Sequence, residues 1–102
     1  MKWNVYVDAE VHDELDAIFD FILQESEDAS LALKVIENID ATIRGLQYMP
    51  LRHRLYPTKR LEERCVRYAI SGAYVIFFIA DEQMHDVHVR HVLHAYQMPN
   101  IV

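Results

Sequence analysis

The spacing of apolar residues changes once along this chain, and that change limits the folds it can adopt. Up to residue 46 the apolar positions recur every three or four residues, as at Val11, Leu15 and Ile18, which is the period of an amphipathic α-helix. From residue 66 onward they alternate or run continuously, as β-strands do. The first half therefore predicts helices and the second half a sheet, so the fold class is α+β.

Local signals divide the first half into three elements. Residues 3–7 are aromatic and β-branched, which predicts a short strand, and Asp8 is suited to cap a helix that runs to about Glu25. Asp28 begins a second apolar stripe, which Pro50 ends. The two stripes predict an αα hairpin, and the many carboxylates between the apolar positions are expected to form its solvated outer face.

Three segments with the period of strands follow, at residues 66–70, 73–80 and 87–94. Ser71 and Gly72 predict a hairpin turn between the first two, so the three form an antiparallel meander. With 102 residues the chain can close one core, and residues 1–102 are expected to form a single domain. Strict alternation divides the last strand into two faces: Val87, Val89, His91 and Leu93 on one, and His88, Arg90, Val92 and His94 on the other.

Composition excludes several classes of protein. The single cysteine, Cys65, rules out an internal disulfide and any multi-cysteine zinc site, and Gly45 and Gly72 are too few for a phosphate-binding loop. No apolar run approaches the roughly 20 residues that cross a bilayer, so we expect a cytoplasmic protein with no membrane contact. Alternation disperses the histidines of the last strand over two faces, so we expect neither a metal site nor another cofactor.

The net charge of -6 conceals a division along the chain. The acidic residues through Asp40 face only Lys2 and Lys34, whereas the segment 51–64 is basic and has no clean period. A long loop in a compact domain is often functional, although this one can also be plain solvated surface. The candidate target- or partner-binding residues are Arg52, Arg54, Lys59, Arg60, Arg64 and Arg90.

A second set of polar residues has the chemistry of RNA cleavage. Arg67 on the first strand of the meander, together with His91, His94 and Tyr96 at the end of the last, can collect at one end of a small sheet. Such groups supply the base, the acid and the cation of that reaction. Histidine and arginine at sheet margins are also common surface residues, so both interpretations stay open.

The order of these elements resembles the RelE/ParE family, the toxins of type II toxin-antitoxin systems, over nearly the whole chain. ParE-like members, often called plasmid stabilisation proteins, are the most similar. The segments that carry the resemblance are "AEVHDELDAIFDFI", "MPLRHRL", "CVRYAISGAYVIFFIADE" and "VHVRHVLHAYQMPNIV". The resemblance implies a growth-inhibiting toxin that a cognate antitoxin neutralises.

Departures from the family pattern bear on the target. RelE-like ribonucleases carry an arginine at about Tyr74 and basic residues around Ala95 to Gln97, and this chain lacks both. The resemblance therefore implies a ParE-like toxin acting on a protein such as DNA gyrase. An mRNA endoribonuclease acting on the ribosome, with Arg67, His91, His94 and Tyr96 as its catalytic residues, is the alternative. A third possibility is an inactive module that only binds antitoxin or forms a homodimer.

Overall fold

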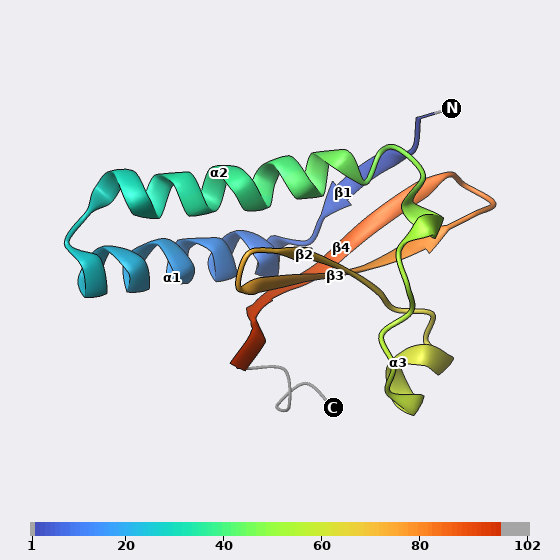
Figure 1. The fold of residues 1–102 in the computed structure, drawn as a ribbon. Helices are drawn as coiled ribbons and strands as arrows, with labels where there is room; N and C mark the ends of the chain where they lie inside the picture. Colours follow the sequence, from blue (N-terminus) through green and yellow to red (C-terminus); the bar gives the residue numbers. More distant parts are fainter. Residues whose placement is uncertain (1, 97–102) are drawn as a thin grey trace.

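A computed structural model describes residues 2–96 of the chain. Two long helices lie side by side on one face of a sheet and project past its end, and a short third helix lies on the opposite side (Figure 1). The elements in chain order are β1 (Asn4–Val7), α1 (Ala9–Ser26), α2 (Ala29–Gly45), the 3₁₀ turn η1 (Pro50–Arg52), α3 (Lys59–Glu63), β2 (Arg67–Ser71), β3 (Tyr74–Asp81) and β4 (Asp86–His94).

The αα hairpin forms as its sequence predicts. Helix α1 begins directly after Asp8, but the Asp8 side chain makes no capping hydrogen bond, so the expected cap is absent. The helix ends at Ser26, and the left-handed backbone of Glu27 turns the chain back. Helix α2 is capped by Asp28, whose Oδ1 accepts hydrogen bonds from the backbone N–H groups of Ser30 and Leu31 at 3.0 and 3.2 Å. A bond from the Ser30 hydroxyl, together with these, holds the pKa of Asp28 below its usual value.

The sheet has the strand order β1-β4-β3-β2. Strands β2, β3 and β4 form the predicted antiparallel meander, with Arg67 opposite Phe78 and Tyr74 opposite His94. Strand β1 runs parallel to β4 at the edge, and the long connection that a parallel pair requires runs through the αα hairpin, α3, β2 and β3. The expected α+β fold is thus confirmed.

The predicted alternation along β4 is wrong beyond Val89. Phe77 pairs with His91 and Phe78 with Val89, so one extra residue, Arg90, is accommodated in a β-bulge. The bulge exchanges the two faces for the rest of the strand, because side chains alternate with a period of two. Val92 therefore joins Val89 in the core beneath the αα hairpin.

Each face of the sheet carries its own apolar cluster. Beneath α1 and α2 a large cluster includes Val11, Ile39 and Phe78, each fully buried. On the opposite face a smaller cluster joins Leu61 of α3 to Phe77. The two clusters are back to back, since consecutive residues of β3 point to opposite faces.

The segment 51–64, which has no clean period, is only partly a loop. Thr58 Oγ1 accepts a hydrogen bond from the N–H of Leu61 at 3.4 Å, which caps α3, and Leu61 is buried against the sheet. An isolated bridge between Leu55 and Arg67 also attaches this segment to the edge of β2. Its basic side chains are therefore held on a short structured arm.

Candidate functional site

An apolar groove of about 570 Å³ separates α1 from the end of β4. It lies where the αα hairpin extends beyond the sheet, and its rim includes Phe21 and Tyr96, which are 58% and 89% exposed. The residues that line it are Glu14, Ala17, Ile18, Phe21, Tyr74, Val92, Leu93, His94 and Tyr96. Large apolar side chains exposed around one concave surface are typical of a binding site for a protein partner.

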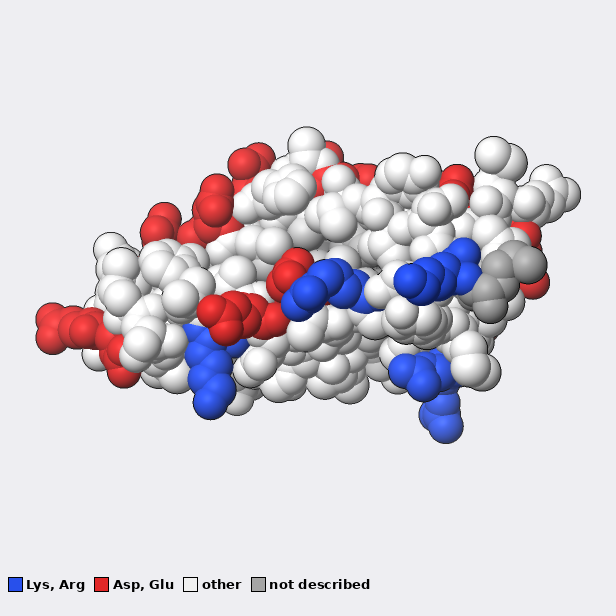
Figure 2. Space-filling view, turned by 90° about the horizontal axis from the view of Figure 1, so that it is seen from above, with Lys and Arg blue, Asp and Glu red and all other residues white. Residues whose placement is uncertain are grey.

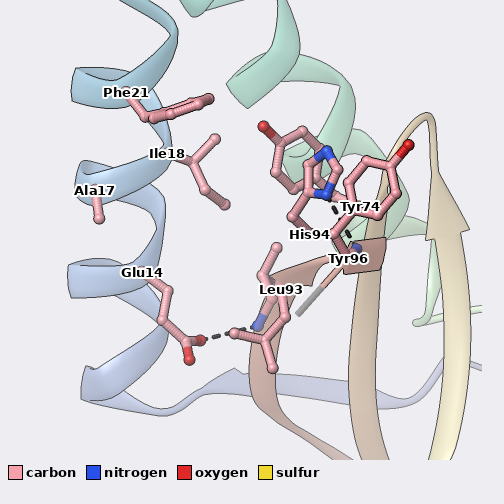
Figure 3. Close-up of a pocket in the computed structure, with 9 residues that line it drawn as sticks. Glu14, Ala17, Ile18, Phe21, Tyr74, Leu93, His94 and Tyr96 are labelled. Atoms are coloured by element: carbon pink, nitrogen blue, oxygen red, sulfur yellow. Dashed lines mark hydrogen bonds between the residues drawn. The ribbon is translucent and has the colours of Figure 1, made fainter. Parts of the chain in front are cut away.

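One wall of the groove is a helical stripe. Glu14, Ala17, Ile18 and Phe21 stand at i, i+3, i+4 and i+7 of α1, so their side chains share one face (Figure 3). This stripe is rotated around the axis of α1 relative to a second stripe, which includes Val11 and packs on the sheet. The prediction that the carboxylates of α1 are solvated surface does not include this groove, although the spacing of these four residues is a usable signal for it.

Glu14 ties this wall to the end of β4. Its Oε1 accepts a hydrogen bond from the backbone N–H of Val92 at 2.8 Å, and its Oε2 lies 2.9 Å from Nδ1 of His91. Strand β1 pairs with β4 only as far as Val89, so the carboxylate takes the place of a neighbouring strand at Val92. Glu14 is held in one orientation, with its side chain 21% exposed.

A smaller hollow of about 380 Å³ lies on the opposite side, between α3 and β4. Three arginines, Arg60, Arg64 and Arg90, stand around it together with His91. Its apolar lining comes from the smaller cluster, including Phe77. The arrangement offers several cations above an apolar floor, which suits an anionic group.

The other candidate basic residues lie outside this hollow. Arg52, Arg54 and Lys59 are exposed, and within residues 2–96 none of the three forms an ion pair. Figure 2 shows acidic side chains along one long edge of the molecule, while the lysines and arginines in view stand away from that edge. Arg90 differs from the other candidates because it pairs with Asp8, at 3.2 Å between Nη1 and Oδ2.

The residues proposed for RNA cleavage do not meet at one point. Arg67 faces Phe78 and His94 faces Tyr74, so the two lie about 13 Å apart along the sheet, at four residues of roughly 3.3 Å each. Arg67 donates through Nη1 to the carbonyl of His53 at 2.6 Å, so its guanidinium holds the segment after η1. Bringing it to the other end of the sheet would break this contact.

The four histidines near the end of the chain each have a different neighbour. His85 stacks on Trp3 in the turn before β4, and His88 stacks on Tyr6. His91 pairs with Glu14, and His94 contacts Tyr74 and Tyr96. In the part of the chain that the structure describes, no three histidine, cysteine or acidic side chains are placed to share a metal ion.

The positions where RelE-like ribonucleases carry cations are occupied differently here. Tyr74 is buried at the start of β3, and burial raises the pKa of its phenol. Ala95 and Tyr96 follow β4 without a basic group, and Gln97 lies outside the described residues. The end of β4 is consequently an apolar and aromatic surface.

Comparison with known proteins identifies the family. A model of the family described as "ParE toxin of type II toxin-antitoxin system, parDE" matches residues 5–99, nearly the whole chain. The chain belongs to the ParE toxin family. No protein among the curated sequences matches it.

Solved structures confirm the ParE-like fold. The chromosomal ParDE toxin-antitoxin system from P. aeruginosa contains a chain that matches with a TM-score of 0.75 and 15% sequence identity, covering 91% of this chain and 96% of its own. The RelBE2 toxin-antitoxin complex from Mycobacterium tuberculosis matches with a TM-score of 0.63 and 15% identity, covering 92% and 99%. Within residues 2–96 no helix is long and apolar enough to span a bilayer.

Proposed function

We propose that this ParE family chain is a cytoplasmic toxin that inhibits growth by acting on a protein target of the DNA gyrase kind, and that a cognate antitoxin neutralises it by covering the groove between α1 and β4. Family membership supports the toxin assignment, and both similar structures are toxin-antitoxin complexes. The observation that carries the choice of target is the separation of Arg67 from His94 along the sheet.

The groove supports the antitoxin part of the proposal. A segment that is disordered when free can bury its apolar side chains in such a groove as it folds. Phe21 and Tyr96 offer large apolar surfaces for this contact, and both are more than half exposed without a partner. An antitoxin seated here would cover one wall from α1 and one from the end of β4.

The polar geometry favours a protein target over RNA cleavage. General acid-base cleavage needs its cation and its proton-transfer groups within hydrogen-bond reach of one reacting site. Arg67 contacts backbone carbonyls of the segment after η1, and His91 contacts the carboxylate of Glu14. Tyr74 supplies no cation in place of these residues, so little positive charge is available there to stabilise a scissile phosphate.

An mRNA endoribonuclease remains the second candidate because of the hollow between α3 and β4. Arg60, Arg64 and Arg90 can neutralise phosphate, and His91 is within the same hollow. This version of the reaction would use His91 without Arg67. This reaction would produce cleaved mRNA, whereas the first proposal predicts loss of gyrase activity, so assays of these two outcomes distinguish the proposals.

Induction of the chain alone, followed by two assays, tests the target. We expect growth arrest with loss of supercoiling by purified gyrase, or accumulation of cleaved DNA, and no new ends in ribosome-bound mRNA by primer extension. Codon-positioned cuts that disappear in His91→Ala or His94→Ala would establish the ribonuclease instead. Normal growth with no response in either assay would leave an inactive antitoxin binder or a self-associating module.

Co-purification with the protein encoded beside this gene tests the antitoxin site. We expect wild-type chain to retain that protein and Phe21→Asp to lose it, because an aspartate would place an unpaired charge in the apolar groove. Leu33→Asp is the matched control, since Leu33 is similarly exposed, at 51%, and does not line the groove. Equal retention by both variants would exclude the groove as the antitoxin site.

A further inference from the structure

We infer that the groove between α1 and β4 selects a helical segment of the antitoxin that carries a lysine or arginine opposite Glu14 and an apolar side chain about two helical turns away, opposite Phe21. This inference rests on the proposed antitoxin site and adds the chemistry of the segment that fills it. It follows from the position of Glu14, the charge of α1 and the dimensions of the helical stripe.

Glu14 is a charged residue in a lining that is otherwise apolar or aromatic. Among the groove residues within the described range 2–96, it is the only aspartate, glutamate, lysine or arginine. Covering the groove with a purely apolar segment would remove water from the carboxylate and cost free energy. A cation on the incoming segment would restore favourable interactions for the charge, so the groove discriminates in favour of such a segment.

The carboxylate is already oriented for a further bond. Its bonds to the Val92 N–H and to His91 fix both oxygens in position before any partner arrives. An ionised carboxylate has about four acceptor sites, so these two bonds leave room for a donor from the groove side. Within residues 2–96 the ion-pair partner of Glu14 is His91, and no lysine or arginine pairs with it.

The other charged residues of α1 also favour a partner segment with basic side chains. Helix α1 contains no lysine or arginine, and the carboxylates it carries besides Glu14 are Glu10, Asp13, Asp16, Asp20 and Glu25. Only Glu14 among these carboxylates lines the groove, so a segment approaching α1 meets a helix of net negative charge whose other carboxylates lie outside the groove lining. An acidic segment would be repelled, and a segment with basic residues at its margins would be attracted.

The stripe on α1 sets the spacing of the partner residues. Glu14 and Phe21 are seven residues apart, which is about 10 Å along a helix at 1.5 Å per residue. A helical segment lying along α1 would match both positions with residues seven apart in its own sequence. Ala17, between them, has a small side chain that allows close approach of the partner helix.

The test uses the purified full chain and the antitoxin protein that co-purifies with it. Dissociation constants are measured for wild type, Glu14→Gln and the control Asp16→Asn, which removes the same charge from an exposed position of α1. We expect Glu14→Gln to weaken binding by at least about ten-fold. Asp16→Asn should change it by less than about two-fold, as an exposed charge does.

A double-mutant cycle then identifies the cation. Each lysine and arginine of the antitoxin is replaced by methionine in turn, and one of them is expected to weaken binding to wild type strongly and to Glu14→Gln hardly at all. These antitoxin variants leave the toxin unchanged, so the cycle does not depend on how well Glu14→Gln folds. The apolar partner of Phe21 should lie seven residues from that position.

The outcomes separate this inference from the proposed site. If Phe21→Asp abolishes binding while Glu14→Gln binds like wild type, or if no antitoxin cation couples to Glu14, the groove is the antitoxin site but the charge selection is wrong. If neither toxin substitution affects binding, both proposals fail. Strong coupling of one cation to Glu14, with Asp16→Asn near wild type, establishes the inference.

Discussion

The two sides of strand β4 present surfaces of opposite character. On the hairpin side, beyond the large cluster that contains Phe78, lies an apolar groove with one carboxylate, Glu14. On the α3 side, above the small cluster that contains Phe77, lies a hollow surrounded by arginines. Strand β4 therefore separates the apolar groove, which carries one carboxylate, from the hollow surrounded by arginines.

The β-bulge at Arg90 lies where the two surfaces meet. Asp8, just before α1, pairs with Arg90, while Glu14 of α1 contacts His91 and the N–H of Val92. The first helix thus holds successive residues of the bulge through carboxylates. Strand alternation places neighbouring residues of β4 on separate surfaces, and the bulge exchanges those two surfaces for the rest of the strand.

The largest expected difference between the two sides is in stability. Phe78→Ala removes a fully buried ring from the large cluster, and we expect the free energy of unfolding to fall by about 3–5 kcal/mol. Leu61→Ala, in the small cluster, should cost less, about 2 kcal/mol, because Leu61 lies at the edge of its cluster on a five-residue helix. Denaturant unfolding measures both.

Hydrogen exchange tests whether the two clusters unfold separately. In Leu61→Ala, exchange should accelerate in α3 while the αα hairpin stays protected, whereas in Phe78→Ala it should accelerate throughout. Equal losses of stability, or uniform exchange in Leu61→Ala, would show that the two clusters form one cooperative unit.

Charge reversal on the basic side should change binding and leave the fold intact. In the double variant Arg52→Glu and Arg60→Glu, both positions are exposed, so the free energy of unfolding should change by no more than about 0.5 kcal/mol per site. Affinity for the cellular target should fall by about ten-fold or more at low salt. The control, Lys34→Glu with Arg44→Glu, makes the same charge change on α2. Equal effects of the two double variants on target binding would show that only net charge matters.

The smallest effect expected is a pH dependence from His53, which packs edge-on against Phe78. Burial lowers the pKa of His53 below 6.5, and the nearby charges of Arg52 and Arg67 lower it further. The unfolded chain therefore binds more protons between the two pKa values, and stability falls as the pH drops through that interval. His53→Gln should lose stability less steeply there in thermal melts. Identical slopes would show that His53 protonates equally easily in the folded protein.

Local sequence was sufficient to predict most of the elements. Asp28 marked the start of α2 because its side chain caps the helix through hydrogen bonds to residues two and three positions later. Asp8 marked the start of α1 correctly, although its side chain makes no capping hydrogen bond. The switch to a period of two predicted β2, β3 and β4, since side chains on a strand alternate whatever the strand pairs with. The antiparallel meander followed from the short turn at Gly72.

The site itself was less accessible to sequence reasoning. The basic residues were predicted as one surface, yet only Arg60, Arg64 and Arg90 gather around the hollow, because α3 and the bulge orient them. Helix α3 was missed because its five residues have no detectable period, and its stability comes from burying Leu61 against the sheet.

The helices and strands other than α3, their order and the family could all be predicted from the sequence, because they depend on local period, turn residues and motif order. Tertiary structure alone decided the parallel pairing of β1 with β4, the bulge at Arg90 and the contact of Glu14 with Val92. The pairing of β1 with β4 and the contact of Glu14 with Val92 join residues more than seventy positions apart. The bulge depends on how the side chains of β4 pack on both faces of the sheet. The geometry of these features depends on which segments pack beside β4, and the spacing of residues along the sequence carries no information about that packing.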